Sequence, residues 1–407
     1  MTVRPIIDSF MRNHVPFLEP RAFIWIQSDG AHRTHCDPAR SASAATPGAE
    51  EMKLPHQNIS FISHALALLL LCVFTAAPGA LAQPTAGPNQ ATYLYKGADR
   101  AQRLLEKARQ EGVVVVYTSL ATTESTPLAK AFEKKYGIRV ELWRALSDKV
   151  VQRAVTEARG KRHTVDVIET NGPELEMVTR EKLTSEFFSP YVADLPAFAL
   201  PPHRQWVSDR LNFFVVAFNT NKVRREELPT GYEGFLDPRW KGRLGIEATD
   251  SEWMATLIKV WGNERGMTFF RKLSEMKPDV RKGHILLSEM IAAGEIEVGL
   301  TVYNANAESM KRRGGPIDWV AVEPVAARPQ GIAVMKSAPH PNAALLFVDF
   351  VLSPEGQELF SSMGRVPASL KVKSDLNNFK YTLVDPAAVL DESEKWEKLW
   401  SELFLKK

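Results

Sequence analysis

The chain has 407 residues, of which 44% are hydrophobic and 24% charged, and its formal net charge at pH 7 is +3. This length exceeds one ordinary core and predicts two domains or lobes, and the composition is that of a soluble globular protein. The near balance of charge gives no reason to expect nucleic acid or an anionic membrane surface as a partner.

An apolar stretch near the N-terminus predicts export. Residues Phe61–Thr75 are apolar, and Ala80–Ala82 places small residues before a possible cut at Gln83. About 15 apolar residues are short for a membrane span of about 20, so residues 52–82 are interpreted as a secretory signal peptide rather than an anchor. Because a signal peptide belongs at the start of a chain, residues 1–51 are interpreted as a non-native upstream extension, a cytoplasmic extension being the alternative.

The predicted mature chain, Gln83–Lys407, contains neither of the two cysteines, Cys36 and Cys72. An exported protein without cysteine has no disulfides to stabilise it, so we expect its stability to come from core burial alone.

The elements of this mature chain alternate between helix and strand. After a helix over Asp99–Glu111, Val113–Tyr117 is a continuous apolar run, typical of a strand buried on both faces. Thr126 can cap a helix that begins at Pro127. The next elements are predicted at Ile138–Trp143 (strand), Ser147–Arg159 (helix), Val165–Ile168 (strand) and from Pro173 (helix). Three successive strand–helix units predict a doubly wound α/β sheet.

Polar side chains follow the first and third of these strands. Thr118 and Ser119 come after the first, and Glu169, Thr170 and Asn171 after the third. In open parallel sheets, ligands bind at the carboxyl ends of the strands, where helix N-termini supply free N–H groups. These five residues are therefore predicted ligand contacts, the alternative being that they only cap or form the turns.

The second half of the chain predicts another α/β lobe and a return to the first. A first crossing between lobes is placed at Asp209-Arg210 and a second at Pro324–Gly331. This division predicts lobe I at residues 83–209 plus 327–407 and lobe II at residues 210–326. Strands are expected at Leu211–Phe218, Leu244–Glu247, Gly294–Asn306 and Trp319–Glu323, and helices at Glu252–Trp261, Gly266–Met276, Leu287–Ala293, Asn342–Leu352, Ser353–Met363 and Glu392–Leu405.

Further candidate ligand contacts lie on the crossing and in lobe II. The set comprises Arg210, Asp250, Ser251, Tyr303, Asn304 and Asn306. Four of them have a structural alternative: Arg210 can form a hinge ion pair with Asp209, Asp250 and Ser251 can cap the next helix, and Tyr303 can form a hydrogen bond at its strand end.

Several longer segments are informative when their order and spacing along the chain are taken together. They are VVVYTSL at Val114–Leu120, AFEKKYGIRVE at Ala131–Glu141, VDVIET at Val165–Thr170, LDPRWKGR at Leu236–Arg243, GEIEVGLTVYN at Gly294–Asn304 and HPNAALLFVDFVLSPEGQELF at His340–Phe360. In this order and spacing, the chain resembles the ABC-transporter extracellular solute-binding proteins of the type II periplasmic class, in the branch that includes ferric-ion-binding proteins. The resemblance covers essentially all of Asp99–Pro367.

The resemblance implies a two-lobed periplasmic-binding-protein type II fold, each lobe a mostly parallel sheet flanked by helices, joined by two crossing strands. It also implies a periplasmic, monomeric protein that captures a small solute by closure and delivers it to an ABC permease with its ATPase. A receptor that docks on a membrane sensor is the alternative.

A secreted enzyme is the less favoured alternative. The sequence contains no GxxxxGK[ST], GxSxG, HExxH or CxxC motif. The histidines of the mature chain are scattered, which does not favour a histidine-centred active site; they are His163, His203, His284 and His340.

Several classes of ligand are compatible with these residues. Ferric-binding members hold iron through two adjacent tyrosines at the position matching Tyr303, and here Asn304 takes the second place, so Tyr303 alone carries over as a metal ligand if the cargo is ferric iron. Hydroxyls, amides and either Arg210 or Arg144 suit an oxyanion or small organic acid such as a phosphonate or carboxylate, or a metal chelate. Glu169 and Asp250 suit an amine. Apart from Fe(III) as a transported ligand, no cofactor is predicted.

Overall fold

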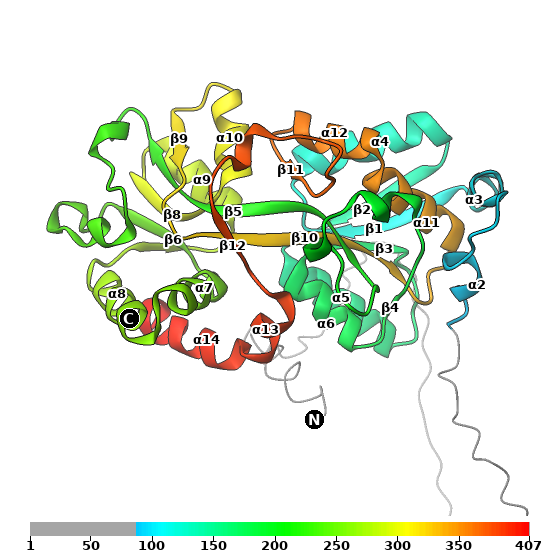
Figure 1. Ribbon diagram of the computed structural model, residues 1–407, viewed down its shortest axis with the longest axis horizontal. Coiled ribbons are helices and arrows are strands. Elements are labelled where there is room, and N and C mark those ends of the chain that lie inside the picture. The colour runs from blue at the N-terminus through cyan, green and yellow to red at the C-terminus, as the bar shows by residue number, and fades with distance from the viewer. Residues whose placement is uncertain (1–86, 407) are drawn as a thin grey trace, which may run out of the picture. The chain divides into compact units, whose positions relative to one another are not determined.

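The computed structural model describes residues 87–406. Their strands form one continuous 12-stranded sheet, whose main path is ordered β2-β1-β3-β10-β5-β8-β6-β7 (Figure 1). The strands of this path are β1 (Val113–Thr118), β2 (Arg139–Arg144), β3 (Val167–Asn171), β5 (Val207–Asn219), β6 (Leu244–Glu247), β7 (Asp279–Arg281), β8 (Val298–Tyr303) and β10 (Val325–Met335). Four short strands pair with β5 or β10 off this path: β4 (Thr184–Ser185), β9 (Ile317–Val320), β11 (Val366–Pro367) and β12 (Tyr381–Leu383).

Lobe I is built on the parallel strands β1, β2 and β3, with β10 antiparallel beside β3. The apolar run predicted as a doubly buried strand is β1, which has a partner strand on each side and two largely buried faces. The helices of this lobe are α2 (Gln90–Tyr93), α3 (Arg100–Glu111), α4 (Thr122–Tyr136), α5 (Ser147–Arg159), α6 (Gly172–Arg180), α11 (Pro341–Leu352) and α12 (Pro354–Ser362). The apolar faces of α3, α4 and α11 meet in one core, which contains Leu104, Phe132 and Phe347, while α5 and α6 contribute Val150 and Leu175 to a second cluster.

The start of α4 differs from the prediction. The helix begins at Thr122, so that Thr126 lies inside it and Pro127 is not its first residue. The Ala121 carbonyl accepts hydrogen bonds from the N–H groups of Glu124 (2.9 Å) and Ser125 (2.8 Å), which closes the first turn before the proline is reached. The early start matters because it places Glu124 inside the protein, in contact with Arg365.

Lobe II places β6 parallel to both β7 and β8. Its helices are α7 (Ser251–Trp261), α8 (Asn263–Glu275), α9 (His284–Ala293) and α10 (Asn304–Arg312). The core is rich in aromatic rings, among them Tyr232, Trp253 and Phe270. Because α7, α9 and α10 each follow a strand of the same parallel set, their N-termini gather at one edge of the sheet.

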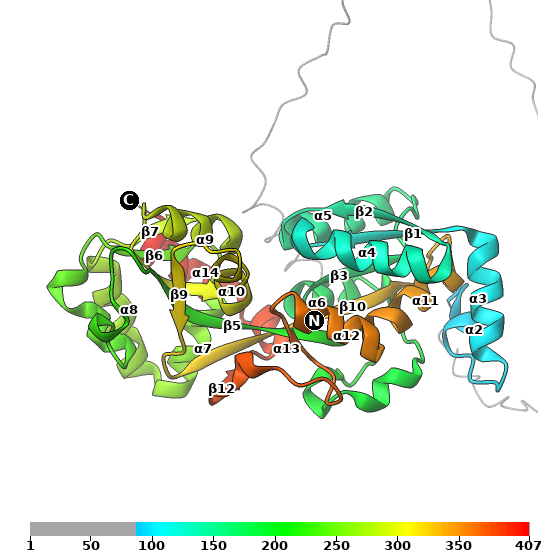
Figure 2. The same cartoon turned by 90° about the horizontal axis from the view of Figure 1, so that it is seen from above.

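Strands β5 and β10 connect the two lobes. They pair antiparallel, with Arg328 of β10 opposite Asn212 of β5, and Figure 2 shows both strands running between the lobes. β10 also pairs with β3 in lobe I, and β5 pairs with β8 in lobe II. All 13 residues of β5 are buried. The two predicted crossings are therefore one paired ribbon, whose side chains can reach both lobes.

The C-terminal region returns to lobe II. Helices α13 (Pro386–Asp391) and α14 (Ser393–Trp400) lead into a π-helical turn at Ser401–Leu405. Trp400 belongs to the aromatic core of lobe II, at 6.4 Å from the Trp253 ring centroid, and α14 lies beside α7 in Figure 1. The lobe bounds derived from the sequence, which assign residues 327–407 to lobe I, remain a prediction. The packing of Trp400 in the core of lobe II argues against that assignment for the last helix.

Short 3₁₀ turns cover Pro190–Asp194, Ala197–Ala199, Arg225–Glu227, Tyr232–Leu236, Pro238–Trp240 and Asp375–Asn377. Within residues 87–406, no helix is long and apolar enough to cross a membrane. The predicted signal peptide and upstream extension lie outside the described residues.

Candidate functional site

Tyr303 stands at the centre of a buried polar cluster. It is the last residue of β8, and its strand neighbour Phe214 packs edge-on against its ring at 5.2 Å. The ring of His284 stacks on it with 3.6 Å between centroids and 21° between planes. The phenolic oxygen accepts a hydrogen bond of 2.6 Å from Nη1 of Arg328, and only 6% of Tyr303 is exposed. Burial raises the pKa of Tyr303 well above its usual value, so its side chain is a protonated phenol at neutral pH.

Arg328 connects this cluster to both lobes. Its Nε lies 2.5 Å from Oε1 of Glu252, near the start of α7 in lobe II. Its Nη2 lies 3.9 Å from Oε2 of Glu174, in the first turn of α6 in lobe I. The guanidinium is a rigid fork of donors, and here it spans groups that the chain brings together from three separate elements.

Carboxylates outnumber the cations of the cluster. Glu174, Glu247, Asp250 and Glu252 face Arg328 and His284. Burial raises the pKa of Glu252 to about 7, against the opposing effect of Arg328. Arg328 and Oε1 of Glu252 form an ion pair without hydrogen-bond alignment, and within the described residues Oε2 of Glu252 and Oε2 of Glu174 have no hydrogen-bond donor. Buried acceptors without donors are costly, so this cluster has acceptor capacity for a ligand or ion.

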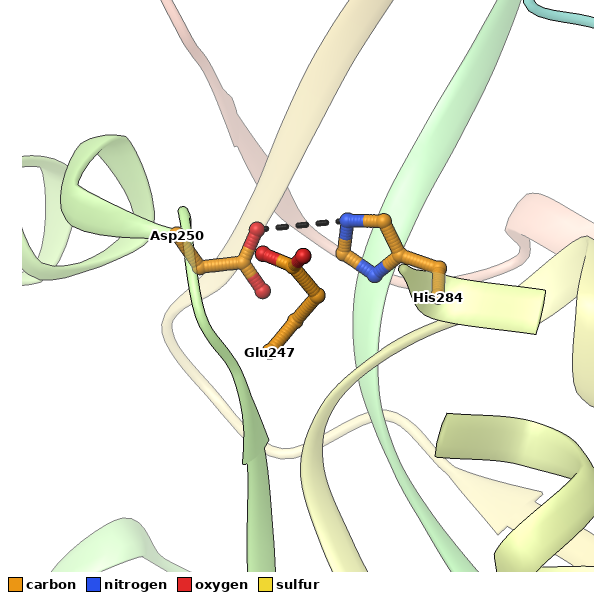
Figure 3. A group of neighbouring side chains, drawn as sticks. All are labelled: Glu247, Asp250 and His284. Carbon is orange, nitrogen blue, oxygen red and sulfur yellow. Dashed lines mark ion pairs between the residues drawn. The ribbon is translucent and has the colours of Figure 1, made fainter. Parts of the chain in front are cut away.

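Three of these side chains converge on one point. Ligand atoms of Glu247, Asp250 and His284 all lie within 4.8 Å of one another, and Figure 3 shows the three side chains pointing toward each other. Nε2 of His284 is 3.2 Å from Oδ1 of Asp250. Burial opposes a charge on His284, but the Asp250 carboxylate raises its pKa. By their donor types, these residues could hold a metal ion.

The predicted contacts of lobe II have different surroundings. Tyr303 and Asp250 lie in the cluster, and Ser251 is the first residue of α7. Oδ1 of Asn304 accepts the backbone N–H of Phe213 (3.1 Å), which ties β5 to the start of α10. Oδ1 of Asn306 accepts from Arg365 at 3.3 Å. Their contact with a ligand stays a prediction.

The predicted contacts of lobe I are joined to one another. Glu169 accepts hydrogen bonds from Thr118 and from Arg210, and Arg210 also contacts Oδ1 of Asp209 at 2.9 Å. Thr170 donates to the hydroxyl of Ser119 at 3.0 Å. The hinge ion pair between Arg210 and Asp209, considered from the sequence as an alternative, is present in the structure.

Asn171 contacts the cluster through Glu174. Its side-chain N–H₂ donates to Ser147 Oγ (2.7 Å) and to Glu174 Oε1 (3.3 Å), so it orients the glutamate that faces Arg328. Arg144, the other predicted anion partner, is exposed at the end of β2. The role of the lobe I set as ligand contacts remains a prediction.

Asp209 gives the protein a predicted pH dependence. Burial, followed by the charge of Glu169, raises the pKa of Asp209 to about 7, although Arg210 opposes this. A carboxyl group whose pKa is higher in the folded state stabilises the fold below about pH 4, and that contribution is lost as the pH rises toward 7. We expect Asp209→Asn to remove a downward slope of at most about 1.4 kcal/mol per pH unit in the free energy of unfolding between pH 4 and 7.

Urea denaturation of the wild type and of Asp209→Asn across this pH range measures the slope. Asp318→Asn is the matched control, because its pKa is lowered rather than raised and its side chain is partly exposed. Equal slopes for wild type and Asp209→Asn would contradict the prediction.

Five residues of the cluster were missed in the sequence: Glu174, Glu247, Glu252, His284 and Arg328. The scattered positions of the histidines gave no sign that His284 packs on Tyr303. The sheet-edge rule could have found four of the five, because Glu247 ends β6 and the other three lie in the first turns of the helices that follow β3, β6 and β7. Arg328 carried no such signal, because it lies in the middle of a crossing strand.

Comparisons with known proteins point to one family. Residues 165–402 match the model of a family described as bacterial extracellular solute-binding protein. The major ferric iron-binding protein of Neisseria meningitidis is 24% identical over 279 residues, which cover 65% of this chain and 83% of that protein.

Two solved structures have the same fold. Iron-bound HitA from Pseudomonas aeruginosa aligns with a TM-score of 0.62 and 22% identity, over 71% of this chain and 99% of its own. AfuA from Actinobacillus pleuropneumoniae, with fructose-6-phosphate bound, aligns with a TM-score of 0.65 and 21% identity, over 73% of this chain and 100% of its own. The two-lobed α/β fold inferred from the sequence is thereby confirmed.

Proposed function

Because the chain belongs to the bacterial extracellular solute-binding proteins, we propose that it is the soluble receptor of an ABC importer, with Tyr303 and Arg328 as its central ligand contacts. One observation carries this assignment. Arg328 lies on a strand that connects the lobes and contacts Tyr303 and Glu252 on one side and Glu174 on the other. A ligand that replaces any of these contacts interacts with both lobes at once.

Capture proceeds by closure of the lobes on the ligand. Contacts from both lobes favour the closed state over the open one, and the β5–β10 ribbon is the element that bends. Lys282, which follows β7, lies 3.3 Å from Asp148 at the start of α5, a contact between the lobes that adds to closure. The closed monomer then docks on a permease, whose ATPase supplies the energy. Binding and delivery are the whole activity, without catalysis.

The ligand carries a carboxylate or phosphate group, either free or in complex with ferric iron. Arg328 presents a fork of donors suited to such an oxyanion, and Tyr303 presents a hydroxyl beside it. The contact between Arg328 and Glu174 is long, at 3.9 Å, so an oxyanion can replace it at little cost. Fructose-6-phosphate, named for AfuA, and iron, named for HitA, represent the two forms.

Tyr303→Phe is expected to weaken ligand binding at least several-fold without lowering the stability of the empty protein. The substitution keeps the ring that stacks on His284 and removes only the oxygen that contacts Arg328. Calorimetric titration with fructose-6-phosphate and with ferric citrate measures the affinity, and thermal unfolding measures the stability. An unchanged affinity for whichever probe binds would remove Tyr303 from the site.

Export places this receptor in the periplasm, through cleavage of the signal peptide at residues 52–82. The denatured mass of protein purified from its host tests this, and the expected mature chain begins at Gln83. A mass that includes residues 1–51 would overturn the targeting argument. The native mass of the same sample reports any bound passenger, and one without an oxyanion group would contradict the role given to Arg328.

A further inference from the structure

We propose that Glu247, Asp250 and His284 bind a divalent transition-metal ion at a site of their own, beside the Tyr303–Arg328 contacts. We call these three residues the lobe II triad. All three come from lobe II, so the site is complete before the lobes close. Metal binding itself is independent of the solute. Only its consequence, which is easier binding of an oxyanion at Arg328, rests on the proposed function.

The first support is that three possible metal ligands converge at the carboxyl edge of the lobe II sheet. Glu247 is the last residue of β6, Asp250 precedes α7 and His284 opens α9, so the loops after two neighbouring parallel strands supply all three. Their ligand atoms lie within 4.8 Å of one another. A metal ion about 2.0–2.2 Å from each donor needs separations of roughly 3–4.4 Å, which side-chain rotations within this cluster reach.

The second support is the orientation of the imidazole ring. Nδ1 of His284 is 3.0 Å from the backbone carbonyl of Thr301, which can only accept, so Nδ1 carries the proton. In the neutral ring, the lone pair is then on Nε2, the nitrogen that faces Asp250 at 3.2 Å. Metal-binding histidines are typically held in this way, with the second nitrogen donating to a carbonyl or carboxylate. The Tyr303 ring, stacked on His284, fixes the plane.

The third support is a buried carboxylate oxygen with no partner. Asp250 is 1% exposed, and among the described residues its Oδ2 has no hydrogen-bond donor. Figure 3 shows this carboxylate directed toward Glu247 and His284. The nearby buried carboxylate of Glu247 raises the free-energy cost of leaving this Asp250 oxygen unpaired, because two like charges in a low dielectric repel each other. A divalent cation between them removes both costs.

Glu247 is oriented as a ligand by its own hydrogen bonds. One of its oxygens accepts the N–H of Gly283 at 2.7 Å, and the other accepts the hydroxyl of Thr249, also at 2.7 Å. Gly283 has a φ of 108°, which side-chain-bearing residues rarely adopt, so a glycine is required where its N–H points at this carboxylate. The oxygen bound to Thr249 also accepts the backbone N–H of that residue at 2.5 Å, so the oxygen bound to Gly283 is the one that keeps a further lone pair for a metal ion.

The donor set indicates the class of metal. One imidazole nitrogen and two carboxylate oxygens, without a thiolate, suit Zn²⁺, Mn²⁺ or Fe²⁺. The Tyr303 oxygen is held by Arg328 rather than by the triad, so the metal has no phenolate ligand. The ion neutralises Glu247 and Asp250, and the acid-rich cluster then accepts an oxyanion at Arg328 without repulsion.

Zinc titration of the metal-free exported protein, prepared with a chelator and without a histidine tag, tests the site. We expect one Zn²⁺ per chain by native mass spectrometry and by calorimetry in the absence of any solute. His284→Gln is expected to weaken the binding at least about 100-fold, because the only nitrogen ligand is lost. Circular dichroism of this variant confirms that it is folded.

His340→Gln is the matched control. His340 also faces a buried carboxylate, with Nδ1 at 2.9 Å from Oδ2 of Asp166, but it lies in lobe I away from the triad. Its substitution is expected to leave zinc affinity unchanged. Glu247→Gln, which keeps the size of the side chain, is expected to weaken zinc binding in a folded protein.

Absence of zinc, manganese and iron(II) binding by the folded wild type would overturn the proposal, as would equal losses in His284→Gln and His340→Gln. Absence would mean that a proton on His284 supplies the counter-charge instead. Because no solute is present in this titration, its outcome is separate from that of the binding test on Tyr303→Phe.

Discussion

Arg328→Lys is expected to weaken oxyanion binding by about tenfold to a hundredfold. Lysine keeps the positive charge beside Glu252, so the buried carboxylate is not left alone, but it lacks the planar fork that reaches Tyr303 and both glutamates. Losing one or two charge-assisted hydrogen bonds costs about 1.5–3 kcal/mol, which corresponds to this range. Calorimetry with fructose-6-phosphate and ferric citrate measures the change.

Arg225→Lys is the control for this experiment. Arg225 contacts Asp318 at 2.9 Å on the exterior of lobe II, with about half of its side chain exposed (52%). The Arg225→Lys variant should bind fructose-6-phosphate and ferric citrate with the same affinity as the wild type. If Arg328→Lys also binds like the wild type, Arg328 is not a ligand contact and the proposed site is wrong.

Arg210→Met is expected to lower the free energy of unfolding by about 3–5 kcal/mol. The substitution removes the only cation among residues 87–406 that contacts Glu169 and Asp209, and the side chains of all three are at most 3% exposed. Methionine fills much of the volume, so the loss reports the uncompensated carboxylates rather than a cavity. Urea denaturation near pH 8, where both carboxylates are ionised in the unfolded chain, measures it.

Two further variants separate this explanation from a general loss of packing. Arg225→Met removes an exposed ion pair and should cost less than about 1 kcal/mol. A triple variant, Arg210→Met with Glu169→Gln and Asp209→Asn, should recover part of the stability, because no charge is then buried alone. A loss below 1 kcal/mol for Arg210→Met would show that these carboxylates do not depend on it.

Local pattern was sufficient for most elements of the fold. The buried run at Val113–Tyr117, the amphipathic helix at Ser147–Arg159 and the strand at Leu244–Glu247 all form where the sequence predicts them. The start of α4 is the instructive failure. A threonine and a proline are good local signals for a helix start, but the helix begins five residues earlier, and this places Glu124 in a buried contact with Arg365 from far along the chain.

The sequence by itself determined the alternation of strands and helices, and with it the sheet edge on which Asp250 and Tyr303 lie, because hydrophobic periodicity and turn chemistry act between near neighbours. Only the tertiary structure decided which polar groups meet there. Glu169 has Arg210 as its partner, while His284 meets Asp250 and Tyr303. Arg328 reaches the cluster only because β10 pairs with β5 and β5 with β8. Such contacts join residues far apart in the chain, and their geometry is set by strand register and burial, which no local pattern encodes.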